Sequence, residues 1–103
     1  MTELAERVGT PARTLGTHYW NPPLLMPLVE VVAGERTDPG AVGRVAETLR
    51  ALGKRPVSCR DVPGFVWNWL QMAVLREAVS LCERGVASPE TVDEILTYGL
   101  ARR

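Results

Sequence analysis

The chain has 103 residues, 46% of them apolar, and its 12 Lys and Arg residues balance 12 Asp and Glu residues. This length suits one small domain or a piece of a larger one, and the apolar share argues against disorder. Nucleic-acid-binding proteins usually carry a basic excess, so the zero net charge argues against DNA or RNA as the main partner.

The sequence lacks membrane and export features. No apolar run approaches the roughly 20 residues of a membrane span, and the N-terminal string MTELAERVGT lacks the basic and apolar regions of a signal peptide. We therefore expect no membrane partner and a cytoplasmic protein. Cys59 and Cys82 fall in unlike segments without a CxxC or His/Cys cluster, so we expect free buried thiols and no metal site.

Local patterns predict the elements in this order: a helix over 2–9, a strand over 14–20, a proline-rich loop over 21–27, a strand over 28–34, a helix within 37–56, a strand over 55–61, a turn over 62–64, a long helix over 65–84 and a last helix from Ser88. Thr2 is expected to cap the first helix, which Gly9 can end. The order predicts an α/β part followed by an all-α part, divided into 1–62 and 63–103.

The helix within 37–56 has the clearest signals. Asp38 or Thr37 can cap it, Pro39 suits its first turn, and Gly53 suits a left-handed position after its end. Its expected apolar face is Val42, Val45, Ala46, Leu49 and Leu52.

The long helix carries two apolar stripes. One holds Trp67, Leu70, Val74, Ala78 and Leu81, and the other holds Met72, Leu75, Val79, Cys82 and Val86. A helix that is apolar on two sides needs cover on two sides, and the chain offers only one more helix. We therefore expect it to pack on further helices or on a second copy.

His18 is the only histidine of the chain, and Glu30 lies among apolar residues. A lone histidine near a strand end is usually structural, and a lone glutamate can be an edge-strand charge. If the two are in contact, however, the carboxylate would fix the imidazole tautomer and leave the other ring nitrogen to take a proton. Asn68 either bonds to a carbonyl of its own helix, lies on the surface, or is an amide that faces the substrate.

Three strings, GTHYWNPPLLMPLVEVVAGE, LGKRPVSCRDVPGFVWNWL and EAVSLCERGVASPETVDEILTYGL, together resemble the 3-hydroxyacyl-CoA dehydrogenase family over nearly the whole chain. The resemblance implies the C-terminal part of a Rossmann-like NAD-binding domain joined to the first helices of a 6-phosphogluconate-dehydrogenase-like helical domain. It implies oxidation of a 3-hydroxyacyl-CoA, as in fatty acid metabolism, or of a related hydroxy acid, with NAD as cofactor. The NPP string leans toward hydroxyacid and carnitine-type dehydrogenases.

The resemblance also implies roles for particular residues. His18 resembles the catalytic base, and Glu30 resembles the acid that orients it. Asn68 resembles the residue that positions the substrate, and Asn21 belongs to the same substrate-binding rim. The family's Gly-rich turn for the dinucleotide is missing, so no cofactor-binding residue is assigned. We therefore expect a central fragment that binds NADH poorly and is inactive alone, which isothermal titration would test.

As an enzyme fragment, the chain could join a partner chain that supplies the NAD-binding half. Two alternatives remain open at this point. The first is a non-enzymatic helical module that forms a homodimer. Alternatively, residues 2–15 resemble a helix-turn-helix in which Arg13 would face DNA. The string that follows, GTHYWNPP, cannot continue a recognition helix, which argues against that interpretation.

Overall fold

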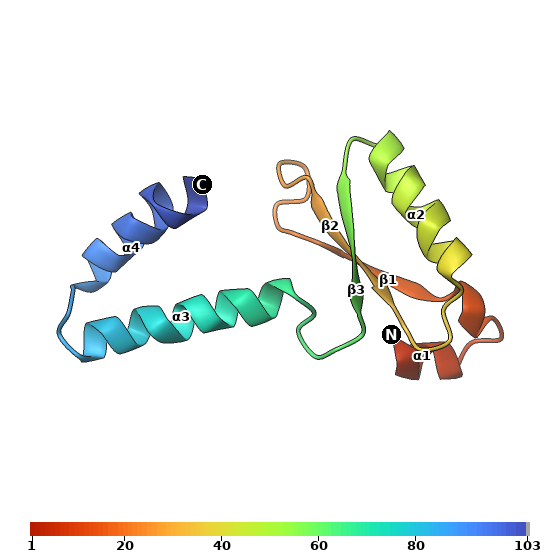
Figure 1. Cartoon of the computed structure of the whole chain (residues 1–103), viewed down its shortest axis with the longest axis horizontal. Coiled ribbons are helices and arrows are strands. Elements are labelled where there is room, and N and C mark those ends of the chain that lie inside the picture. Colours follow the sequence, from red (N-terminus) through yellow and green to blue (C-terminus); the bar gives the residue numbers. More distant parts are fainter. Residues whose placement is uncertain (103) are drawn as a thin grey trace. The chain divides into compact units, whose positions relative to one another are not determined.

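The computed structural model describes residues 1–102, which form two compact units: Met1–Val66 and a second unit that begins at Trp67. Along the chain these contain α1 (Thr2–Glu6), η1 (Pro11–Arg13), β1 (Leu15–Tyr19), β2 (Leu28–Ala33), α2 (Pro39–Ala51), β3 (Arg55–Arg60), α3 (Trp67–Glu83), α4 (Pro89–Tyr98) and η2 (Leu100–Arg102) (Figure 1). An α/β part followed by helices alone confirms the fold class expected from the sequence.

The first unit is built on a three-stranded sheet of order β1-β2-β3. β2 is antiparallel to β1 and parallel to β3, so it is the central strand. Its sequence LVEVVA is β-branched and nearly all apolar, as a strand covered on both faces requires. His18 of β1 lies directly opposite Glu30 of β2.

α2 packs on one face of this sheet (Figure 1). Val29 and Val31 of β2 meet Leu49 of α2 there, and all three are buried. The expected signals of this helix are confirmed, because the Asp38 side chain accepts from the Gly40 N–H and Gly53 has φ of +76°. This packing fixes β2, and with it Glu30, in the middle of the unit.

One member of the expected apolar face of α2 was wrong. Leu52 is 70% exposed, whereas Ala41, in the first turn of the helix, is buried. The helix ends at Ala51, and Leu52 is its C-cap. Its side chain therefore lies beyond the last turn that can reach the sheet.

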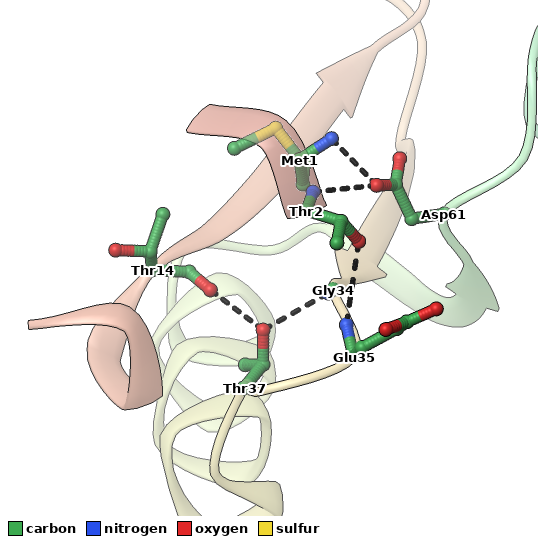
Figure 2. Close-up of polar contacts among 7 residues, drawn as sticks. All are labelled: Met1, Thr2, Thr14, Gly34, Glu35, Thr37 and Asp61. Atoms are coloured by element: carbon green, nitrogen blue, oxygen red, sulfur yellow. Dashed lines mark hydrogen bonds and ion pairs between the residues drawn. The ribbon is translucent and has the colours of Figure 1, made fainter. Parts of the chain in front are cut away.

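The N-terminal segment is tied to the ends of the two parallel strands (Figure 2). The Asp61 carboxylate, just after β3, accepts from the terminal ammonium of Met1 at 2.7 Å and from the Thr2 N–H at 2.6 Å. Thr2 was expected to cap the first helix, which is wrong, since the N-cap is Met1. The Thr2 hydroxyl instead accepts from the Glu35 N–H.

A second set of bonds in Figure 2 joins β1 to β2. The Thr37 hydroxyl donates to the Thr14 carbonyl at 2.6 Å and accepts from the Gly34 N–H at 2.9 Å. One side chain thus links the residue before β1 to the residue after β2. This holds the strand register at the end of the sheet remote from His18.

The helix-turn-helix interpretation is wrong. After α1 the chain forms the single turn η1 and then enters β1. Arg13 therefore ends a three-residue turn and has no recognition helix to sit on.

The second unit consists of α3, α4 and η2. α3 begins at Trp67, two residues later than expected, because Phe65 adopts a positive φ of 50° that no α-helix contains. The Ser88 side chain caps α4 by accepting from the Thr91 N–H, and Val92 is buried. Within residues 1–102, no helix combines the length and apolar character needed to cross a membrane.

Candidate functional site

The pairing register of β1 and β2 brings His18 and Glu30 together. Residues directly opposite on antiparallel strands direct their side chains to the same face of the sheet. Nδ1 of His18 accordingly lies 2.7 Å from Oε2 of Glu30. His18 and Glu30, which are twelve residues apart in the sequence, are therefore in direct contact in the structure.

Glu30 is buried to 1% exposure, the most buried charged side chain among the described residues. A carboxylate removed from water is costly unless both oxygens have partners. Oε2 contacts His18, and Oε1 accepts from the Val66 backbone N–H at 3.0 Å. Donors from two separate segments therefore hold the carboxylate in one orientation.

The imidazole of His18 is held on one side and open on the other. Its side chain is 30% exposed, against 1% for Glu30. An ionised carboxylate can only accept, so Nδ1 carries the hydrogen of the shared bond. In the neutral imidazole, Nε2 is then the unprotonated nitrogen, and it has no hydrogen-bond partner within residues 1–102. This is the arrangement of an oriented general base.

Phe65 covers the pair from the segment after β3. Its ring centroid lies 5.5 Å from that of His18, with the ring planes tilted by 58°. Phe65 is half-buried, and the next amide is the Val66 N–H that contacts Glu30. Two consecutive residues therefore contact both members of the pair.

The loop that follows β1 carries Asn21, which is exposed and joined to Pro22 by a cis peptide bond. Lys54, just before β3, donates from Nζ to the Pro23 carbonyl and to the Met26 carbonyl, the latter at 3.2 Å. This half-buried ammonium therefore bonds to both sides of the turn formed by residues 21–26. The turn begins three residues after His18.

Asn68 lies in the first turn of α3, in the second compact unit, and is half-buried there. It is followed by Trp69, which is 64% exposed. Its substrate-positioning role stays a prediction.

Cys59 of β3 adds no reactive nucleophile to the first unit. Both cysteines of the chain are free and half-buried. Burial first, and then the charges of Glu30 and Asp61, raise the pKa of the Cys59 thiol, so it stays protonated at neutral pH and is a poor nucleophile. Among the described residues, no group of three or more His, Cys, Asp or Glu is arranged to hold a metal ion.

No sequence pattern indicates Phe65, the Val66 amide or Lys54 as part of this site. A signal for the second donor on Glu30 was present, because a buried carboxylate that uses one oxygen on histidine needs a partner for the other. Which backbone segment supplies it depends on the tertiary path of residues 61–66. No local pattern encodes that path.

Two family descriptions match the chain. Residues 1–62 match the 3-hydroxyacyl-CoA dehydrogenase NAD binding domain, and residues 64–103 match the C-terminal domain of the same family. A 5-formyl-3-hydroxy-2-methylpyridine 4-carboxylate 5-dehydrogenase of Mesorhizobium japonicum is 44% identical over 97% of this chain and 33% of its own length. A probable 3-hydroxybutyryl-CoA dehydrogenase of Deinococcus radiodurans is 45% identical over 97% of this chain and 36% of its own length.

Solved structures agree. A crystal structure of a 5-formyl-3-hydroxy-2-methylpyridine 4-carboxylic acid 5-dehydrogenase, described as an NAD⁺-dependent dismutase, matches with a TM-score of 0.91 and 43% identity over 98% of this chain and 33% of its own. The (S)-3-hydroxybutyryl-CoA dehydrogenase of Ralstonia eutropha matches with a TM-score of 0.85 and 34% identity over 97% and 35%. The chain spans about a third of the length of the curated relatives that it matches.

Proposed function

Because its two parts match the two domains of the 3-hydroxyacyl-CoA dehydrogenases, the chain belongs to that family, and we propose that it supplies the general base of a hydroxyl oxidation. The base is His18, oriented by Glu30. The observation that carries the proposal is the 2.7 Å contact between Nδ1 of His18 and the buried carboxylate of Glu30.

The chemistry assigned to the pair is removal of a proton. Oxidising a secondary alcohol to a ketone removes a proton from the hydroxyl oxygen and a hydride from the carbon that bears the hydroxyl group. Nε2 of His18 takes the proton, and the imidazolium that forms is stabilised by the adjacent carboxylate of Glu30. A positioned base of this kind contributes about 10²- to 10⁴-fold to the rate.

NAD is the cofactor that the family implies, and when bound it accepts the hydride. The described residues do not form the cradle for its pyrophosphate. The strand–helix–strand unit from β2 through α2 to β3 places the Asp38 carboxylate at the helix N-terminus, where it accepts from the Gly40 N–H at 3.1 Å. A carboxylate there repels a phosphate. We propose that segments outside this chain hold the dinucleotide and that the chain alone binds it poorly.

The proposed substrate is a 3-hydroxyacyl-CoA or a related hydroxy acid. The relatives are named for substrates of both kinds, including 3-hydroxybutyryl-CoA and L-carnitine. Asn68 and Asn21 are the amides that we propose to contact it. Each offers a donor and an acceptor suited to a hydroxyl or carbonyl group.

The experiment uses a chimera, because this chain covers a third of its relatives. The matched segment of the Deinococcus radiodurans protein is replaced by this chain, and NADH formation from 3-hydroxybutyryl-CoA and from L-carnitine is followed. We expect an active chimera whose kcat falls about 10²- to 10⁴-fold on His18→Asn substitution. Glu35→Gln, an exposed change on the far end of β2, is the matched control.

Two outcomes would contradict the proposal. In one, the chimera folds and binds NADH but oxidises neither substrate. In the other, His18→Asn lowers kcat no more than the Glu35→Gln control does.

A second function, association through α3, is favoured by one observation. α3 has no buried residue among its seventeen, and large apolar side chains remain exposed along it, including Leu70, Met72 and Leu75. Apolar surface of this extent marks an interaction face. We propose that it is covered by a second copy of the chain or by further helices of the same protein.

A further inference from the structure

The turn between β3 and α3 has an unusual backbone. Gly64 has φ of +80° and Phe65 has φ of +50°. Glycine adopts such values at no steric cost, but a bulky residue there is strained and persists only when its surroundings hold it. Phe65 is the only non-glycine residue with positive φ among residues 1–102.

The strained turn delivers two contacts to the same pair. The Phe65 ring packs at 5.5 Å on the ring of His18, and the Val66 N–H donates to Glu30 at 3.0 Å. The Phe65 φ sets how its side chain and the peptide that follows are both turned relative to the peptide that precedes it. Moving it into the ordinary negative range would turn both groups away from their targets.

We propose that Phe65 is a positioning residue for the His18–Glu30 pair, an inference that rests on the proposed function of that pair. Its ring limits the rotation of the imidazole, and its backbone places the amide that holds the second oxygen of Glu30. Phe65 does not itself react. Its effect is to keep Nδ1 on the carboxylate and Nε2 directed outward.

If Phe65 only filled space, an apolar side chain of similar volume would replace it without changing the tautomer of His18. Only the free energy of unfolding would then change. A positioning role requires the flat ring, so the tautomer of His18 responds to loss of the ring even in a folded chain. A tilted pair of aromatic rings is stabilised by more free energy than the burial of its apolar area alone provides.

The test is the His18 tautomer in the 103-residue chain, read from ¹⁵N chemical shifts of the imidazole at a pH where it is neutral. His18 is the only histidine, so the imidazole signals need no assignment to a residue, and couplings to the ring hydrogens tell Nδ1 from Nε2. We expect Phe65→Leu to lower the ratio of the Nδ1–H form to the Nε2–H form about two- to tenfold. Phe65→Tyr keeps the ring and should leave this ratio at the value of the parent chain. Val62→Ala, which alters an exposed apolar side chain in the same segment, is the matched control.

Folding of each variant is verified by its amide spectrum, and Phe65→Met replaces Phe65→Leu if the latter unfolds. An unchanged tautomer ratio in a folded variant without the ring overturns the proposal. An equal tautomer ratio in Phe65→Leu and Phe65→Tyr also overturns it.

The chimera gives a second readout. There Phe65→Leu is expected to lower kcat about two- to tenfold while KM stays the same. An inactive parent chimera would count against the proposed function, whereas the tautomer measurement on the chain alone would still decide the role of Phe65.

Discussion

His18 and Glu30 occupy opposite positions of one antiparallel strand pair, and Nδ1 of His18 lies 2.7 Å from Oε2 of Glu30. A slip of one residue would move Glu30 to the other face of β2, into the core that Val29 and Val31 form with α2. The hydrophobic pattern that stabilises the sheet therefore also places His18 and Glu30, the candidate catalytic pair, side by side. The same alternation of side chains between the two faces of β2 determines both the core and the site.

Glu30→Gln should reverse the tautomer of His18. The amide oxygen can still accept from the Val66 N–H, but its NH₂ group must then donate to Nδ1 of His18. The neutral imidazole would carry its hydrogen on Nε2 and could no longer act as a base. Imidazole ¹⁵N shifts check this, and a variant that keeps the Nδ1–H form would refute it.

The same position predicts an order of stabilities. Glu30→Gln should lower the free energy of unfolding by about 1 kcal/mol, because one charge-assisted bond becomes neutral. Glu30→Ala should cost about 3 kcal/mol, since it leaves a buried N–H without its acceptor. Urea denaturation measures both. Equal losses would mean that the hydrogen bonds contribute little.

Lys54→Met should loosen the turn that follows β1. The ammonium binds the carbonyls of Pro23 and Met26, and its loss should cost about 1 kcal/mol. We expect faster hydrogen exchange at the Leu25 and Met26 amides, which bond to Pro22 within that turn. Arg50→Met, on the exposed side of α2, is the control and should leave these rates unchanged.

Asp61 should give the fold an acid-sensitive contact. Bonds from the Met1 ammonium, and then from the Thr2 N–H, lower its pKa from 3.8 to about 2. Because the folded pKa lies below the unfolded one, the contact stabilises the fold above about pH 4 and is lost as the pH falls through about 2. Asp61→Asn should remove this part of the pH dependence of Tm, while Asp93→Asn should retain it.

The exposed face of α3 should drive association. Leu75 is 52% exposed in the middle of the helix, and a charge there opposes burial in an interface. Sedimentation should show the parent chain heavier than a monomer and Leu75→Glu as a monomer, with Glu77→Gln as the control. A parent chain that is monomeric at all concentrations would exclude self-association.

Elements with strong local signals could be predicted from the sequence. Asp38, Pro39 and Gly53 mark the ends of α2 because caps and left-handed positions restrict residue type. The sequence predicts the start of α3 two residues early, since the apolar residues Phe65 and Val66 fit a helix locally. The tertiary contacts of both residues with the His18–Glu30 pair override that preference.

The candidate site was only partly accessible to the same reasoning. The resemblance indicated His18 and Glu30, and the strand register explains their contact. Phe65 and Lys54 could not be found in this way, because an aromatic contact and a lysine–carbonyl bond connect segments that are distant in sequence. Their spacing follows from the path of the chain and not from a period of any one element.

The tautomer of His18 in the unmodified 103-residue chain tests most directly whether Glu30 orients His18 as a base. Imidazole ¹⁵N shifts at a pH where the ring is neutral distinguish the two forms. The account predicts the Nδ1–H form, with Nε2 unprotonated and ready to accept a proton. A predominance of the Nε2–H form would contradict it, because His18 could not then be a base oriented by Glu30.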